Sequence, residues 1–175
     1  IGKTKKFHKL QSIISLISLH DEVTLKQIKH RSHKILFKGE FSKKISSRNT
    51  IRKTLSILDK KKLLKKKYLV LIKKNIPLKS GMGGGSMNAA TLIKILIKKK
   101  IIKLDKKKLQ NLCDSIGQDV KLGLYKNAMY LNSNNRVKAL NKMTKYFLLL
   151  FMPKYGCSTK SIFSKVRKFS KPIKN

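Results

Sequence analysis

Four of the chain's nine glycines fall within the five positions Gly81 to Gly85, in the stretch SGMGGGSMNAATLIKILI. Glycine loses much backbone entropy on folding, so a local cluster indicates a backbone that adopts unusual angles or approaches another group closely. The strand-like segment YLVLIKKNIP precedes the cluster, and an apolar run with helical spacing follows it, so we expect a helix over 87–100 that Ser86 caps. A glycine turn between a strand and a helix start gathers backbone N–H groups at the positive end of the helix dipole. We therefore expect a phosphate site here, with an ordinary glycine turn as the alternative.

Strand-like patterns recur on both sides of this loop. We expect a buried strand over 10–19 that continues with alternation through DEVTLKQI, and a strand with a loop within 28–41. Weaker strands are expected in AMYLN, over 128–132, and in KYFLLLFM, over 145–152.

Helical patterns fill the intervals between these strands. A helix is expected from Asn49 through NTIRKTLSILDKKKLL, and a second between a cap at Asp105 and a stop at Gly117. Asp119 follows that stop directly, and TKSIFSKVRKF, over 159–169, closes the chain as a further expected helix. This order of strands and helices, without strict βαβ alternation, predicts an α+β fold.

The chain carries 44 lysine and arginine residues against seven acidic residues, for a net charge of +37. A field of this strength attracts any polyanion, so nucleic-acid binding becomes a candidate function. Only five of the 44 cations are arginine, whereas contacts to guanine and phosphate favour the guanidinium fork. The lysines also alternate with Ile and Leu along the whole chain. An AT-rich genome, which accumulates lysine codons at solvated positions, accounts for this spread better than a specific nucleic-acid interface does.

Residues that commonly bind metals or act as nucleophiles are scattered. Cys113 and Cys157 have neither CxxC spacing nor a histidine motif beside them, which argues against a disulfide framework and a thiol nucleophile. His20, His30 and His33 lack carboxylate or cysteine partners at metal-ligand spacing, and we interpret them as surface or loop residues. No apolar run approaches the roughly 18 residues of a membrane span. We expect no metal held by protein ligands alone, no membrane association and a cytoplasmic location.

The glycine loop departs from two familiar phosphate motifs, because no lysine follows its last glycine and Ser86 stands where GxGxxG needs its third glycine. PLKSGMGGGSMNAAT instead resembles the phosphate-binding signature of the GHMP small-molecule kinases. GKTKKFHKLQSI, GEF with NTIRKTLSIL, SIGQDV and GCSTKSIF resemble further segments of that family in the same order. The similarity covers nearly all of the chain and is greatest to the branch that acts on 4-diphosphocytidyl-2-C-methyl-D-erythritol.

The resemblance implies the two-domain fold of GHMP kinases. It predicts an ATP-binding N-terminal domain over 1–139, with a ribosomal-protein-S5-domain-2-like topology, and the beginning of a C-terminal substrate domain over 140–175. Family members start with a strand that carries a K-[IV]-N segment and continue through a longer C-terminal domain. We therefore expect a fragment that lacks the first strand and most of the second domain, and that is unstable and inactive by itself because it exposes sheet edge and core.

The resemblance also assigns roles in phosphoryl transfer. Asp119 matches the catalytic aspartate that accepts the proton of the attacking hydroxyl, the alternative being a solvated turn residue. Asn49 matches a position near the adenine. ATP and Mg²⁺ are the implied cofactors, since phosphoryl transfer depends mainly on alignment and charge neutralisation. The residues expected around the ATP phosphates are Gly81, Gly83, Gly84, Gly85, Ser86 and Asn88.

For the second substrate, His8 matches a histidine that hydrogen-bonds the cytosine, and Phe7 and Phe163 match aromatic residues that stack on its two faces. Such stacking contributes on the order of 1–3 kcal/mol per ring in other proteins, and ordinary core packing is the alternative for both phenylalanines. The chain departs from the family pattern at Phe7, where a tyrosine is usual, and at Met87, where a serine is usual.

The implied activity is ATP-dependent phosphorylation of the 2-hydroxyl of 4-diphosphocytidyl-2-C-methyl-D-erythritol, a step of the non-mevalonate (MEP) route to isoprenoids, by a monomer or homodimer. Two alternatives remain open at this point. One is another GHMP kinase that acts on a sugar, homoserine or mevalonate. The other is a basic nucleic-acid-binding module, which rests on charge alone.

Overall fold

The computed structural model describes residues 11–141, 147–152 and 164–167. Within these ranges the chain divides into two compact units. The larger unit comprises residues 18–78 and 82–124, and the smaller unit comprises the other described residues. Almost all of the buried core belongs to the larger unit, which also contains most of the glycine loop.

The larger unit is built on a three-stranded sheet with the order β2-β4-β3. Strand β2 (Glu22–Ile28) pairs antiparallel with β4 (Lys67–Lys73), and β3 (Lys34–Lys38) pairs parallel with β4 on its other side. A parallel pair needs a crossover, which here runs through the short helix η1 (Glu40–Ser42) and helix α1 (Thr50–Lys60). The expected strands of this region are therefore confirmed, and their arrangement includes one βαβ crossover.

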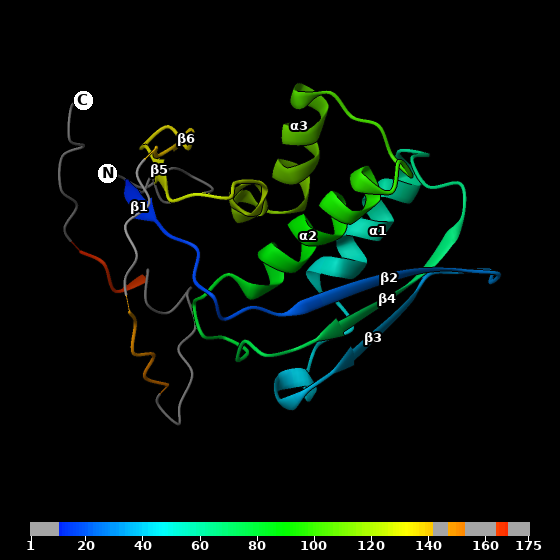
Figure 1. Cartoon of the computed structure of the whole chain (residues 1–175), viewed down its shortest axis with the longest axis horizontal. Coiled ribbons are helices and arrows are strands. Elements are labelled where there is room, and N and C mark those ends of the chain that lie inside the picture. The colour runs from blue at the N-terminus through cyan, green and yellow to red at the C-terminus, as the bar shows by residue number, and fades with distance from the viewer. Residues whose placement is uncertain (1–10, 142–146, 153–163, 168–175) are drawn as a thin grey trace. The chain divides into compact units, whose positions relative to one another are not determined.

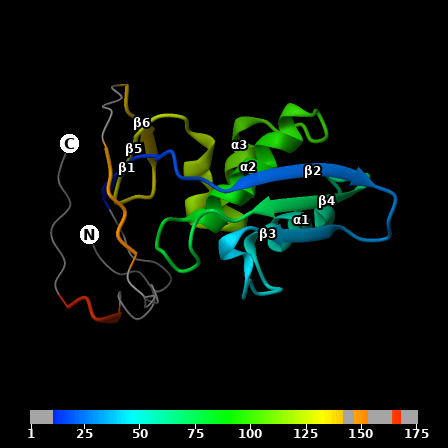
Figure 2. The same ribbon diagram turned by 60° about the horizontal axis from the view of Figure 1, so that its bottom comes forward.

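Helices cover one face of this sheet, as Figures 1 and 2 show. Helix α1 packs beside α2 (Gly84–Lys98), and α3 (Lys106–Ile116) with the 3₁₀ segment η2 (Gln118–Leu124) completes the helical layer. The side chains of β4 alternate, so that Tyr68, Val70 and Ile72 are buried, whereas the residues between them are half-buried and the last residue, Lys73, is exposed. This mixed, two-layer arrangement confirms the α+β fold class.

Of the two helix caps expected from the sequence, the one at Asp105 is confirmed and the one at Ser86 is not, and Asn49 provides a cap that the sequence analysis did not predict. Oδ1 of Asn49 accepts a hydrogen bond from the amide of Arg52 at 2.9 Å, and Asp105 caps α3 through the amide of Lys108 at 2.7 Å. The expectation that Ser86 caps the central helix is wrong, because α2 already begins at Gly84 with Gly83 in the cap position. Glycine lowers helix propensity, and this is why the sequence pattern placed the start too late.

The smaller unit contains three short strands in the order β1-β5-β6: β1 (Ser12–Ile14), β5 (Met129–Leu131) and β6 (Val137–Ala139). The expected buried strand over 10–19 is wrong in length and burial, since β1 has three residues and Ile13 is 71% exposed. The expected strand at β5 is confirmed. The expected strand over 145–152 does not form in its described part, 147–152.

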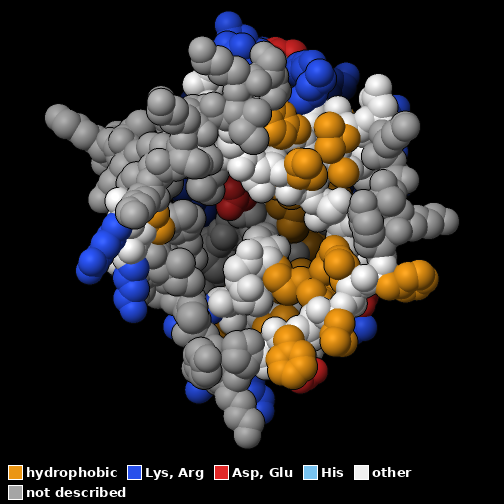
Figure 3. Space-filling view, turned by 90° about the vertical axis from the view of Figure 1, so that its left-hand side faces the viewer, with side chains coloured by type: hydrophobic (Ala, Val, Ile, Leu, Met, Phe, Trp, Pro, Cys, Tyr) orange, Lys and Arg blue, Asp and Glu red, His pale blue; other side chains and the backbone are white. Residues whose placement is uncertain are grey.

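The apolar run Phe147–Met152 is exposed, and Phe147 and Phe151 have exposed fractions of 106% and 91%. Exposed hydrophobic side chains are visible in the space-filling view of Figure 3. The expected closing helix over 159–169 lies almost wholly outside the described residues. In the part of the chain that the structure describes, no helix combines the length and apolar character needed to cross a membrane.

Candidate phosphate-binding site

The glycine loop enters α2 through a left-handed residue. Gly83 has a φ of +65°, and a Cβ placed on it would meet no atom of the described part of the chain within 4 Å. Replacing Gly83 by a residue with a side chain would therefore strain the backbone, because L residues rarely adopt a positive φ, and would not cause a steric clash with the described residues. The space in front of Gly83 is open to a ligand. Gly81, in the smaller unit, also has a positive φ, of +74°.

The first turn of α2 leaves backbone donors available. The carbonyl of Gly83 accepts hydrogen bonds from the amides of Ser86 and Met87, at 2.9 and 3.0 Å. The amides of Gly84 and Gly85 have no acceptor among the described residues. Unpaired N–H groups at a helix N-terminus, backed by the helix dipole, form an anion-binding site.

A second helix begins beside this one. A Cβ added at Gly85 would lie 3.1 Å from the hydroxyl oxygen of Thr50, the first residue of α1. The N-termini of α1 and α2 therefore meet at this point, and their positive dipole ends add. Asn49, the N-cap of α1, holds its position by donating from Nδ2 to the carbonyl of Ser46 at 3.1 Å. The arrangement favours a ligand with more than one negative charge.

Asp119 lies at the start of η2, which packs against the first two turns of α2. The packing is close at Gly123, where an added Cβ would lie 2.5 Å from the Cβ of Ala90 and 3.2 Å from the sulfur of Met87. Val120 is fully buried in the core, whereas Asp119 is exposed. The carboxylate of Asp119 has no hydrogen-bond or ionic partner among the described residues. An exposed carboxylate of this kind is available to a ligand.

The turn before Asp119 is fixed by groups from other elements. Lys53, on α1, donates from its ammonium group to the carbonyl of Ile116 at the end of α3. This contact satisfies one of the carbonyl groups that a helix C-terminus leaves unpaired. The expected stop at Gly117 is confirmed, and its amide bonds the carbonyl of Cys113 at 2.9 Å.

A buried carboxylate, that of Asp21, lies next to Gly84 of the glycine loop, and the sequence analysis did not identify it. The side chain of Asp21 is 0% exposed and forms an ion pair with Lys74, whose side chain is 5% exposed. Asp21 also accepts hydrogen bonds from the amides of Asn75 and Ile76 and from Nδ2 of Asn88, each at 2.8 Å. These partners lie 53 to 67 positions away in sequence, so no local pattern could reveal them.

The hydrogen bonds of this cluster decide its ionisation. Burial by itself raises the pKa of Asp21, but the donors Lys74, Ile76 and Asn88 outweigh it and lower the pKa below its ordinary value. Asp21 is therefore ionised at neutral pH. The buried charges of Asp21 and Lys74 balance each other, as buried ions require.

The other residues expected from sequence fall into three groups. Asn88 is buried and directs its amide donor to Asp21, whereas the hydroxyl of Ser86, in the first turn of α2, has no partner in the described part of the chain. Phe7, His8 and Phe163 lie outside the described residues. The roles of all these residues toward ligands stay predictions.

His33 lies in the loop directly before β3, which is one of the two expected environments, but it is not a surface residue, because its side chain is only 9% exposed. Its Nδ1 accepts the amide hydrogen of Tyr68 at 3.0 Å, its Nε2 lies 3.2 Å from Oδ2 of Asp59, and its ring stacks on Tyr68 with centroids 6.0 Å apart. Together these contacts join β4 to α1. His20 and His30 are exposed, as expected. Burial raises the pKa of the Cys113 thiol to about 11, which agrees with the absence of a nucleophilic role there.

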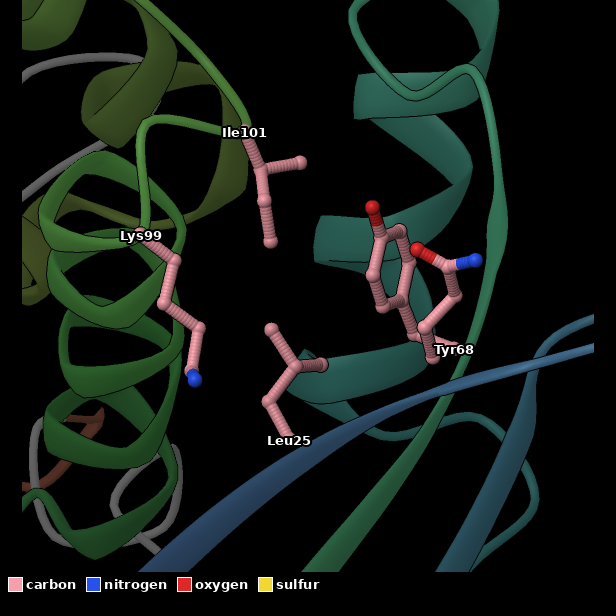
Figure 4. Close-up of a pocket in the computed structure, with 5 residues that line it drawn as sticks. Leu25, Tyr68, Lys99 and Ile101 are labelled. Carbon is pink, nitrogen blue, oxygen red and sulfur yellow. The ribbon is translucent and has the colours of Figure 1, made fainter.

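Among the described residues, no group of three or more His, Cys, Asp and Glu side chains could hold a metal ion. A cavity of about 360 Å³, lined by Leu25, Gln27, Tyr68, Lys99 and Ile101, lies beyond the C-terminal end of α2 (Figure 4). With a rise of about 1.5 Å per residue, the length of α2 puts this cavity on the order of 20 Å from the glycine loop. The cavity and the candidate phosphate site are therefore separate.

The family model for the GHMP kinases N terminal domain matches residues 49–127, from the cap of α1 to just beyond η2. A 4-diphosphocytidyl-2-C-methyl-D-erythritol kinase of Pelagibacter ubique is 48% identical over 172 residues, which cover 98% of this chain. The chain is thus similar to the GHMP kinases over residues 49–127 and to a named member of that group over almost its whole length. A protein of the same name from Thermotoga maritima is 31% identical over 158 residues, or 90% of this chain.

A solved structure of a kinase agrees with the fold. The crystal structure of a 4-(cytidine 5'-diphospho)-2C-methyl-D-erythritol kinase matches 95% of this chain with a TM-score of 0.71 and 22% identity. The GHMP kinase fold expected from the sequence is therefore confirmed. The chain spans 61% of the Pelagibacter protein, 56% of the Thermotoga protein and 58% of the solved chain.

Proposed function

We propose that the protein containing these residues is an ATP-dependent kinase that phosphorylates the 2-hydroxyl of 4-diphosphocytidyl-2-C-methyl-D-erythritol in the MEP pathway. The names of the similar proteins from Pelagibacter ubique and Thermotoga maritima support the substrate. The observation that carries the proposal is local to the larger unit. The N-termini of α1 and α2 meet at Gly85 and Thr50, α2 packs against η2, and neither the amides of Gly84 and Gly85 nor the carboxylate of Asp119 on η2 has a partner among the described residues.

The triphosphate of ATP fits this site by its chemistry. Its oxygens would accept hydrogen bonds from the amides of Gly84 and Gly85, with the hydroxyl of Ser86 one residue further on. No atom of the described residues lies within 4 Å of a Cβ placed at Gly83, so the phosphates can approach the backbone closely there. Mg²⁺ would accompany ATP, held by phosphate oxygens together with few protein ligands, and would neutralise charge in the transition state. Asn49 would lie toward the adenine.

Asp119 would act as the general base. Its carboxylate accepts the proton of the substrate 2-hydroxyl as the oxygen of that hydroxyl bonds to the γ-phosphorus and the bond to the β,γ-bridging oxygen breaks. An exposed carboxylate without an internal partner is suited to this role, because no existing hydrogen bond must be broken when the substrate arrives. For the cytidyl group, we propose a hydrogen bond from His8 and stacking by Phe7 and Phe163.

The test uses the complete reading frame that contains these residues. We expect transfer of label from γ-labelled ATP to diphosphocytidyl-methylerythritol, and at least a 100-fold loss of kcat in Asp119→Asn, within the range of general-base contributions. ATP affinity should change little. The matched control is Asp105→Asn, which replaces another exposed aspartate with a residue that caps α3 equally well. Full activity of Asp119→Asn would exclude the base assignment.

The net charge of +37 supports one alternative, a nucleic-acid-binding module. Such binding weakens steeply as salt rises, because it depends on the release of counterions from phosphates. It would also be indifferent to Asp119→Asn. Specific RNA or DNA binding at physiological salt, together with no transfer by an ATP-binding protein, would favour this alternative. We otherwise propose a cytoplasmic monomer or homodimer without a specific nucleic-acid partner.

A further inference from the structure

The Asp21 cluster takes no part in the reaction proposed above, although it is the most deeply buried group of charges in the larger unit. Asp21 immediately precedes β2, and its carboxylate has four donors. A buried carboxylate with this many donors is fixed in orientation, because turning it would leave several polar groups unpaired. It is therefore a rigid point in the fold.

The donors come from both sides of the glycine loop. One carboxylate oxygen accepts the backbone amides of Asn75 and Ile76, which lead into the loop from β4. The other oxygen accepts the Lys74 ammonium group and Nδ2 of Asn88, in the second turn of α2. The chain between Ile76 and Asn88 is thus held at both ends by a single side chain.

Further contacts hold the entrance to the loop. Nδ2 of Asn75 donates to the carbonyl of His20 at 2.9 Å, and the amide of Lys74 donates to the carbonyl of Lys38 at 2.7 Å. Gly84 lies directly over the cluster, since a Cβ added there would be 3.5 Å from Nζ of Lys74 and 3.6 Å from Oδ2 of Asp21. The cluster therefore supports the residue whose amide points toward the phosphate site.

We propose that Asp21 is a positioning residue, which acts through Lys74 and Asn88 to hold the glycine loop and the first turns of α2 in the geometry that binds phosphate. The inference rests on the proposed binding of ATP at this loop. Lys74 is neutralised by Asp21, so its ammonium group acts as a fixed hydrogen-bond donor to that carboxylate more than as a free charge for the phosphates. The same logic makes Asn88 a support for the loop, with its amide donor directed inward.

Asn88→Ala is the decisive variant, because it removes one donor and keeps the buried ion pair intact. Asp21→Asn would leave Lys74 buried without a counter-charge and is expected to fold poorly. The matched control is Leu96→Ala, a buried substitution two turns further along the same helix that destabilises the core without touching the loop. Each variant is made in the complete reading frame, and its melting temperature is recorded.

The measurement is calorimetric binding of ATP and, separately, of adenosine, which has no phosphates. In Asn88→Ala we expect the Kd for ATP to rise about tenfold or more, since misplacing a positioned group by about 1 Å costs up to roughly 100-fold. The Kd for adenosine should stay unchanged. In Leu96→Ala both constants should stay unchanged, although the melting temperature falls.

Three results would overturn the inference: an unchanged ATP affinity in Asn88→Ala, an equal loss for adenosine, or the same loss in Leu96→Ala. A parent protein that binds neither ATP nor inorganic triphosphate would overturn it together with the proposed function. The parent protein could bind ATP, and Asn88→Ala could raise the Kd for ATP as expected, while no phosphoryl group is transferred to the cytidyl substrate. In that case the proposed substrate is wrong and the positioning role of Asp21 stands.

Discussion

Asp21 and Asp59 are two of only seven acidic residues, and the carboxylate of each accepts hydrogen bonds from residues of other elements. Burial raises the pKa of Asp59, but hydrogen bonds from Lys67 and His33 outweigh it, and the pKa lies below its ordinary value of 3.8, as it does for Asp21. A carboxyl group whose pKa is lower in the folded state stabilises that state above its unfolded pKa. This stabilisation is lost as the pH falls through the folded pKa.

We therefore expect the free energy of unfolding to be nearly constant from pH 7 to about 5 and to fall below about pH 4. Asp59→Asn should cost about 1–3 kcal/mol at pH 7, because Lys67 and His33 lose an anionic acceptor, and should cost less at pH 3. Urea unfolding across this range measures both effects. Glu40→Gln, which changes an exposed residue without a partner among the described residues, is the control. An Asp59→Asn cost that did not depend on pH would contradict the argument.

At the residue scale, sequence patterns identify polar side chains whose hydrogen-bond partners are a few positions away. They do not identify polar side chains whose partners lie far away in the sequence. Asp105 is recognisable as the cap of α3 because a cap bonds an amide three positions away. Asp21 and His33 were not recognised, because their partners come from other elements. Only the pairing of strands brings such groups together, and no residue-spacing rule anticipates it.

At the scale of elements, the contact of η2 with α2 determines where Asp119 lies. Gly123 allows this close approach, because a Cβ there would overlap the Cβ of Ala90 at 2.5 Å. Lys94, one turn further along α2, donates to the carbonyl of Gly123 at 3.0 Å and fixes the register. The segment that bears the proposed base is thereby attached to the helix that begins at the phosphate site.

Gly123→Ala should destabilise the larger unit by about 1–3 kcal/mol through overpacking. Ala90→Gly alone should cost about 1 kcal/mol, because glycine weakens a helix. The double variant should be more stable than the sum of the two losses predicts, because removing the methyl group of Ala90 makes room for the new one. Guanidinium unfolding of the four proteins measures the coupling energy. Strict additivity would mean that η2 shifts away from α2 without cost.

Elements with a regular pattern were predictable, and elements that depend on context were not. The burial of alternate residues in β4 and the amphipathic faces of α1 and α3 follow from periodicity. The start of α2 was missed because its first residues are Gly84 and Gly85, which the fold makes helical against their propensity. Strand β1 was expected to be buried from its apolar composition, but composition cannot tell which neighbours cover a strand.

At the scale of the whole molecule, two properties of the chain oppose each other. The net charge of +37 keeps copies of the chain apart, whereas the run Phe147–Met152 exposes six consecutive apolar residues by 51% or more. Monomeric proteins rarely leave a continuous apolar patch of more than a few hundred Å² open to water. The predicted domain boundary near residue 140 would assign this run to the second domain, and that assignment stays a prediction.

The balance between these properties should depend on salt. Charge repulsion is screened over about 8 Å at physiological ionic strength, whereas the apolar attraction is not weakened by moderate salt. We therefore expect the 175-residue chain to bind a hydrophobic dye and to self-associate more as NaCl rises, which light scattering measures. Leu149→Ser with Phe151→Ser should reduce both signals, and the matched pair Lys60→Ser with Lys100→Ser should not. A chain that stays monomeric at high salt, or that associates less as salt is added, would mean that electrostatic contacts and not this apolar run govern its association.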